Sequence, residues 1–215
     1  MGRPREFDCD EALDIITRQF WERGYEGTSF ADIETAVGFS KPSLYRAFGN
    51  KEQLFQRAVD HFARHYLGFV SQALQARTAH ESVRQLVRGV IGAVTGSDTP
   101  PGSLIVLELG GCACEREAIR INLEQWRDEF EQMLVERLVR ARDEGELPEE
   151  TDCAALSRYL ATFCDGIALR AKSGTKRPDL IAMMEFALAA IPVPGPGRSK
   201  RGGKKTSDAP HTDRD

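Results

Sequence analysis

The sequence has few cysteines and no long uninterrupted run of apolar residues. Its 215 residues include five cysteines, too few and too scattered for the disulfide framework of a small secreted protein: Cys9, Cys112, Cys114, Cys153 and Cys164. No stretch of about 18 apolar residues is present to span a membrane, and the first residues lack the apolar segment of a signal peptide. We therefore expect reduced thiols, no membrane partner and a cytoplasmic location.

The sequence also lacks the short motifs of common enzymes. It contains no glycine-rich phosphate-binding loop, no nucleophile elbow and no obvious carboxylate pair. The only obvious charged candidates for a reaction centre in the C-terminal half are Glu108, Asp165 and Arg170. A small helical enzyme is thus the least favoured class, and we predict no catalytic residues and no cofactor.

Two pairs of residues have side chains that bind metals. Cys112 and Cys114 are two apart, so on a helix they point about 200° apart and chelate poorly. His61 and His65 are four apart and share a helix face, but no glutamate completes a zinc-protease motif. We predict no metal site and leave the roles of both pairs open.

A general excess of positive charge is missing as well. The net charge is -4 and the isoelectric point about 5.7, which do not indicate nucleic-acid binding. The first 65 residues hold nine basic and eleven acidic residues, a net charge of -2. Between residues 39 and 51, however, Lys41, Arg46 and Lys51 occur without any acid. Positive charge is therefore concentrated in one short stretch.

Apolar residues recur at helical spacing almost everywhere, and no strand alternation is convincing. We predict an all-α fold of nine helices, separated by glycine, proline and N-capping residues. The expected helices cover residues 9–23, 30–37, 41–48, 51–74, 80–94, 104–109, 117–143, 153–173 and 178–191.

Residues 30–48 carry the most informative pattern. Two short helices are separated by Gly38, which supplies the backbone freedom of a tight turn, and Ser40 is the expected N-cap of the second helix. Leu44 and Phe48 are expected to face inward, leaving Lys41, Ser43, Tyr45 and Arg46 to face outward. A helix of this kind fits the major groove of DNA, and its N-terminus favours a phosphate.

This region resembles the TetR/AcrR family of repressors closely. The resemblance is carried by residues 20–29 (FWERGYEGTS), Asp32-Ile33, Ala36-Val37-Gly38, residues 41–48 (KPSLYRAF) and residues 51–55 (KEQLF), in the expected order. It implies a nine-helix regulator with a three-helix DNA-binding domain and a homodimer formed by its last two helices. It also implies that double-stranded operator DNA, bound as a palindrome, and a small-molecule effector are the partners.

The resemblance also implies which residues contact DNA. Tyr45 is alternatively a core aromatic, Lys51 a solvated side chain, and Arg3 and Arg5 a flexible terminus instead of a basic arm on the DNA. The full predicted set is Arg3, Arg5, Thr28, Ser29, Ser40, Lys41, Pro42, Ser43, Tyr45, Arg46 and Lys51.

The C-terminal half is expected to enclose an apolar effector cavity. The alternative is that its apolar residues are ordinary core. The residues expected to line the cavity are Leu107, Trp126, Phe130, Met133, Phe163 and Ile167. For the dimer we expect two apolar stripes, Leu156/Leu160/Phe163/Ile167 and Leu180/Met184/Ala187/Ile191.

The predicted organisation has three parts. Residues 1–50 form the N-terminal arm and helix-turn-helix domain, residues 51–191 the sensing and dimerisation domain, and residues 192–215 a disordered basic tail. The tail either solubilises the protein or attracts phosphates non-specifically. The favoured function is a ligand-responsive repressor, and the alternative is a ligand-independent activator or architectural protein.

Overall fold

The computed structural model describes residues 9–110 and 116–194, and the described residues are all-α. Arg3, Arg5, Cys112, Cys114 and most of the predicted tail lie outside these ranges. The helices are α1 (Cys9–Arg23), α2 (Phe30–Val37), α3 (Lys41–Phe48), α4 (Lys51–Tyr66), α5 (Phe69–Ala73), α6 (Ala79–Val94), α7 (Leu104–Leu109), α8 (Glu117–Asp143), α9 (Cys153–Lys172) and α10 (Arg177–Ala189).

The predicted fold class is confirmed, and one expected helix is divided in two. The helix expected over residues 51–74 ends at Tyr66 and resumes as α5 after Leu67 and Gly68. Glycine allows the backbone at residue 68 to pass close to the last turn of α4, because a Cβ there would lie 2.7 Å from the carbonyl oxygen of Arg64. The interruption separates α4 from α5.

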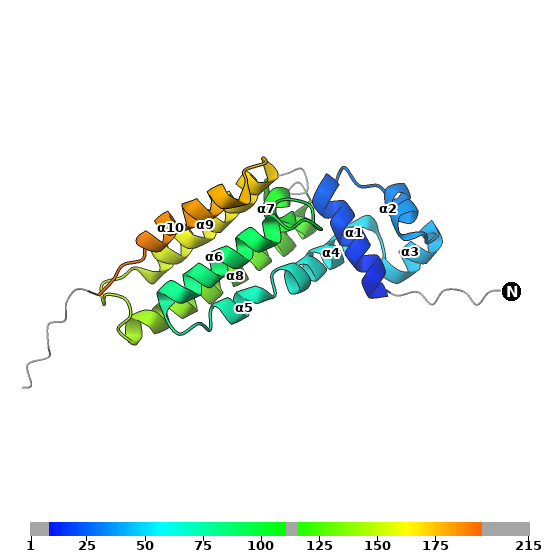
Figure 1. The fold of residues 1–215 in the computed structure, drawn as a ribbon. Helices are drawn as coiled ribbons and strands as arrows, with labels where there is room; N and C mark the ends of the chain where they lie inside the picture. The colour runs from blue at the N-terminus through cyan, green and yellow to red at the C-terminus, as the bar shows by residue number, and fades with distance from the viewer. Residues whose placement is uncertain (1–8, 111–115, 195–215) are drawn as a thin grey trace, which may run out of the picture.

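The helices form two groups that meet at α4 and α7. Helices α1, α2 and α3 lie at one end of the elongated molecule, and α6, α8, α9 and α10 run side by side at the other (Figure 1). Helix α4 packs most extensively on α1, and it also contacts α7 and α8. Helix α1 contacts α7 as well, so within the described residues both α4 and α7 connect the α1–α3 end to the remainder.

The first hydrophobic cluster, which we call the N-terminal cluster, is rich in aromatic side chains. Phe20 packs edge-to-face on Phe55 at 5.1 Å, and Trp21 packs in the same way on Phe62 at 4.7 Å. The indole N–H of Trp21 donates a hydrogen bond to the carbonyl oxygen of Gly102 at 3.0 Å. Helix α1 is thereby tied both to α4 and to the segment that precedes α7.

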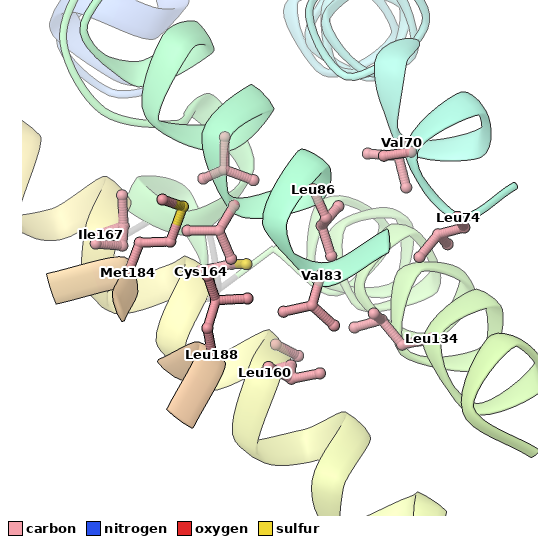
Figure 2. Packing of buried hydrophobic residues seen from close by; sticks show 14 of the residues in the cluster. Val70, Leu74, Val83, Leu86, Leu134, Leu160, Cys164, Ile167, Met184 and Leu188 are labelled. Carbon is pink, nitrogen blue, oxygen red and sulfur yellow. The ribbon is translucent and has the colours of Figure 1, made fainter. Parts of the chain in front are cut away.

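The second cluster, which we call the bundle cluster, consists of aliphatic residues, cysteine and methionine from α5, α6, α8, α9 and α10. Figure 2 shows Val83 and Leu86 of α6 facing Leu160 and Cys164 of α9, with Leu134 of α8 nearby. Fully burying each leucine or valine contributes about 1.5–3 kcal/mol of transfer free energy. This packing makes the helices of the bundle one unit.

The two apolar stripes predicted for dimerisation are mostly used inside the subunit. Leu160 and Ile167 of α9 and Leu180 and Met184 of α10 are buried in the bundle cluster. The prediction that these residues face a second subunit is therefore wrong, because α9 and α10 each pack on α6 through them. Different apolar residues on these helices remain exposed: Tyr159, Leu169, Ile181 and Phe186.

Within the described ranges, every helix is too short or too polar to cross a membrane.

Candidate functional site

Helix α2 begins at a capping box. The Ser29 hydroxyl oxygen accepts a hydrogen bond from the Asp32 backbone N–H, and the Asp32 carboxylate accepts one from the Ser29 backbone N–H at 2.8 Å. The Ser29 hydroxyl also donates to the Asp32 carboxylate, and this bond, together with the one from the Ser29 backbone N–H, lowers the pKa of Asp32. Helix α2 ends at Gly38, whose φ of 74° turns the chain toward α3. Local residues thus fix the first half of the helix-turn-helix.

Helix α3 has a buried face and an exposed face. Leu44 and Phe48 are buried, whereas Lys41, Tyr45 and Arg46 are exposed. The Tyr45 ring stacks on Phe30 of α2 with 4.4 Å between centroids, yet 45% of the residue remains exposed. The prediction that α3 turns Lys41, Tyr45 and Arg46 outward agrees with this placement. Tyr45 is held by α2 without being part of the core.

The N-terminus of α3 is capped differently from the prediction. Ser40 occupies the N-cap position, but its hydroxyl lies 3.0 Å from that of Ser43 and makes no capping hydrogen bond. The Glu34 carboxylate of α2 instead accepts a hydrogen bond from the backbone N–H of Lys41 at 3.0 Å. The N-terminus of α3 therefore already has an anionic partner, the Glu34 carboxylate, at the place where a phosphate was expected.

The structure separates Thr28 from the other predicted DNA contacts. Thr28 is fully buried. Its hydroxyl donates a hydrogen bond to the carbonyl oxygen of Gly24 at 2.8 Å, and the carbonyl oxygen of Gln19 lies 3.3 Å from the same hydroxyl. A buried, internally bonded hydroxyl cannot reach DNA without local opening. Its neighbour Ser29 is exposed, as are Ser40 and Pro42, and Ser43 is half-buried. Of the predicted DNA contacts that lie in the described part of the chain, the Thr28 side chain is the one that conflicts with the fold.

Lys51 opens α4, which has its own capping box between Asn50 and Gln53. Its ammonium lies 4.3 Å from the centroid of the Tyr25 ring, a cation–π contact. Partial burial lowers the pKa of Lys51. Lys51 is thus held in place instead of being freely solvated.

Two residues that were not predicted fix the orientation of α3. Glu34 caps its N-terminus, and Arg57 of α4 donates a hydrogen bond to the Ala47 carbonyl oxygen at 3.0 Å near its C-terminus. Neither residue stands out in the sequence, because each acts on a helix from a neighbouring helix. Both ends of the exposed helix are consequently anchored by charged side chains from α2 and α4.

The described part of the bundle contains a small, largely apolar cavity of about 80 Å³. Trp126 and Phe130 line it, as predicted, together with unpredicted residues of α5, α6, α7 and α9. Its polar side chains include Ser103, Arg127 and Asp165, and an Arg127 nitrogen lies 3.8 Å from an Asp165 oxygen. The apolar residues around it include Leu67, Val70, Val90, Val94, Ile105, Val106, Leu109 and Ala168.

Four of the six predicted lining residues lie elsewhere. Leu107 packs against the N-terminal cluster, and Ile167 is fully buried in the bundle cluster. Met133 and Phe163 line hollows on the surface. Leu134 and Cys164, the residues that follow them, face the interior, and successive residues of a helix point 100° apart. The helical period predicted the right helices but not which side chains border the cavity.

Within the described ranges, no cluster of three or more histidine, cysteine or acidic residues is placed to hold a metal ion. His61 and His65 stack on each other at 4.1 Å, and His61 contacts the Asp14 carboxylate at 3.3 Å. The Tyr66 hydroxyl donates to the same carboxylate at 2.7 Å. These residues join α1 to α4.

Comparisons with known proteins agree with this geometry. The family model for bacterial regulatory proteins of the tetR family matches residues 12–58. The repressor ComR of Escherichia coli K12 is 28% identical over 193 residues, covering 89% of this chain and 92% of its own length. The regulator YezE of Bacillus subtilis 168 is 31% identical over 162 residues, covering 74% and 84%.

A solved structure has the same fold over nearly the whole chain. It is a cysteine mutant of the TetR family transcriptional regulator CifR, complexed with 26-base-pair double-strand operator DNA. It is 39% identical to this chain, covers 89% of it and 100% of its own chain, and has a TM-score of 0.83. The protein therefore belongs to the TetR family of bacterial transcriptional regulators.

Proposed function

We propose that the protein is a homodimeric repressor that binds a palindromic operator through α3 and is released by a small effector bound in the bundle. The exposed face of α3 carries this proposal, because Lys41, Tyr45 and Arg46 project from a helix whose opposite face is buried. Two such helices related by a twofold axis read half-sites about 34–36 Å apart. ComR is described as a transcriptional repressor, and CifR as a TetR family transcriptional regulator that was solved in complex with operator DNA.

The proposed DNA contacts come from the start of α2, from α3, from the start of α4 and from the N-terminal arm. Lys41 and Arg46 are the candidates for guanine edges or phosphates, and Tyr45 is a candidate for phosphate. Lys51 is proposed to contact phosphate at the start of α4, and Arg3 and Arg5 to form an arm on the DNA. The hydroxyls of Ser29, Ser40 and Ser43, with Pro42, complete the set, from which we omit the Thr28 side chain.

Selection of bound sequences from random DNA tests the recognition helix. The intact protein should enrich a palindrome, whereas Lys41→Ala and Tyr45→Ala should each weaken binding to it by about 1–3 kcal/mol if they contact bases or essential phosphates. Arg88→Ala is the matched control, since Arg88 is an exposed basic residue on α6. Unchanged enrichment by both α3 variants would remove the assignment of α3.

The division of labour follows from this proposal. Residues 1–50 supply the DNA-binding unit, and residues 51–191 supply sensing and dimerisation. Within that second part, we propose that exposed apolar residues of α9 and α10, foremost Phe186 of α10, form the dimer interface. Phe186 is 79% exposed in the single chain, and aromatic residues are enriched in protein–protein interfaces.

We further propose that the effector is small, neutral and mostly apolar. The Arg127 and Asp165 charges at the cavity offset each other, so a charged ligand would add an uncompensated charge to apolar surroundings. Burial raises the pKa of the Cys164 thiol to about 12, which keeps that part of the wall neutral. The volume of about 80 Å³ is roughly half that of an engineered cavity, about 150 Å³, that binds benzene.

A matched pair of probes tests this preference. n-Butanol and butyrate have the same chain length and differ in charge, so n-butanol should raise the melting temperature more than butyrate. Ala168→Leu, which narrows the cavity, should remove the difference. An equal response to both probes, or no response, would favour the alternative of a regulator that acts without an effector.

A further inference from the structure

Three distant segments of the chain meet at the side chain of Tyr25. The residue follows α1, and its ring is contacted by Lys51 at the start of α4 and by Arg116 immediately before α8. The Lys51 ammonium lies 4.3 Å from the ring centroid, and the Arg116 guanidinium carbon lies 5.2 Å from it. A proposed phosphate contact therefore shares an aromatic ring with the residue that caps the start of α8.

The ring itself is held in a fixed position. Tyr25 is 3% exposed, and its ring packs edge-to-face on Phe55 at 5.1 Å and stacks with Phe20 at 6.2 Å. The backbone N–H of Tyr25 donates a hydrogen bond to the Glu108 carboxylate of α7 at 3.1 Å. Gly24 precedes Tyr25 with a φ of 76°, a left-handed backbone conformation that favours glycine.

Charges around the ring restrict where the Lys51 ammonium can lie. Glu26 forms an ion pair with Arg116 at 3.3 Å, which fixes the guanidinium beside the ring. Glu26 and Glu108 attract Lys51, whereas Arg116 repels it. The position of the ammonium is therefore biased by the ring, by two carboxylates and by one guanidinium at once.

We propose that Tyr25 and Arg116 are positioning residues for Lys51, so that the turn after α1 and the start of α8 set one phosphate contact to the operator. This inference rests on the proposed DNA-binding function. It also gives the cavity a short connection to DNA, because Val106 and Leu109 line the cavity while Glu108, on the same short helix, holds Tyr25.

The salt dependence of operator binding tests the proposal without any effector. The probe is the operator recovered by the selection experiment. Loss of a single phosphate contact reduces the slope of log affinity against log salt by about 0.9 per subunit. Lys51→Ala should show this reduction, and Tyr25→Leu should approach it because the platform for the ammonium is gone. Arg116→Ala should reduce the slope in part.

Matched variants separate positioning from general disruption. Tyr25→Phe keeps the ring and should retain the slope of the unmodified protein, as should Arg120→Ala, which removes a partly exposed arginine one turn along α8. In the presence of Lys51→Ala, neither Tyr25→Leu nor Arg116→Ala should reduce the slope further. If Tyr25→Leu does not fold, the double-mutant cycle of Arg116→Ala and Lys51→Ala decides whether Arg116 acts through Lys51.

The outcomes distinguish the inference from the function on which it rests. An unchanged slope for Lys51→Ala would remove both the proposed phosphate contact and the inference, while leaving the α3 tests intact. A reduced slope for Lys51→Ala with unchanged slopes for the folded Tyr25 and Arg116 variants would overturn the positioning role alone. Additive reductions in the double variants would overturn it as well.

Discussion

The N-terminal cluster and the bundle cluster are built from different kinds of side chain. Among the described residues, the buried members of the N-terminal cluster include six aromatic residues, whereas those of the bundle cluster are aliphatic residues, cysteine and methionine. Aromatic rings pack in specific edge-to-face geometries, while aliphatic side chains and methionine adapt to irregular spaces. The difference suits a fixed surface on α3 at one end and a cavity that accepts a ligand at the other.

The largest expected effect is the loss of operator affinity when the proposed dimer interface on α10 is disrupted. The bundle would then both hold the cavity and join the two subunits. Phe186→Glu places a charge on the exposed face of α10 and should yield a monomer in light scattering. Binding two half-sites together exceeds binding one by about 100- to 10,000-fold, so operator affinity should fall by that amount. Phe186→Leu, which stays apolar, should remain a dimer, and so should Ile121→Glu on α8. A dimeric Phe186→Glu protein would place the interface elsewhere.

Substitutions of similar size in the two clusters sharpen the comparison of their packing. Phe55→Leu removes the edge-to-face contacts with Phe20 and Tyr25, each worth about 0.5–1.5 kcal/mol. We expect the free energy of unfolding in urea to fall by about 1–3 kcal/mol from these two contacts. Leu86→Met in the bundle nearly conserves volume and should cost less than about 1.5 kcal/mol. A larger loss for Leu86→Met would contradict the distinction.

A smaller effect is expected at the exposed surface of the N-terminal part. Glu34→Gln keeps an oxygen acceptor for the Lys41 backbone N–H but removes a negative charge from the N-terminus of α3. Operator affinity at low salt should rise about two- to fivefold, since a charge at a helix end is worth roughly 0.3–1 kcal/mol. The gain should shrink at high salt because of screening.

The control for Glu34→Gln is Glu149→Gln, in the loop before α9. That variant should bind operator as the unmodified protein does, because Glu149 is an exposed acid remote from α3. Weaker binding by Glu34→Gln at low salt would show that the carboxylate is needed to position α3.

Local signals made the N-terminal part predictable from sequence. The Ser29 capping box, the turn at Gly38 and Pro42 in the first turn of α3 act within a few residues, so they are visible in the printed chain. The Glu34 contact with α3 and the Glu108 contact with Tyr25 are not, because they join residues that lie seven and 83 positions apart in different segments of the fold. Such contacts depend on how the helices pack.

The cavity was less predictable for a related reason. Trp126 and Phe130 border it, but Met133, three positions further along α8, is 37% exposed. A helical stripe gives the direction of the interior only to within one residue, or 100°. Where side chains fail to fill space is decided by several helices at once, which no single stripe records.

The smallest expected effect is a pH dependence in the link between α1 and α4. Burial lowers the pKa of His61, outweighing the hydrogen bond to Asp14 that raises it, while His65 and Arg64 lower it further. Between the lowered pKa and the ordinary value of 6.5, the unfolded chain binds more protons than the folded one. The stability contributed by neutral His61 is therefore complete above pH 6.5 and is lost as the pH falls through the folded pKa.

Urea unfolding at a series of pH values measures this contribution. His61→Asn removes the titrating group, so the decline in the free energy of unfolding below pH 6.5 should be shallower than in the unmodified protein. His80→Asn is the control, because His80 is exposed on α6, and its decline should match the unmodified protein. An unchanged decline in His61→Asn would assign the acid sensitivity to other groups. Asp14 is one of these, because its carboxylate is hydrogen-bonded to Tyr66 and His61.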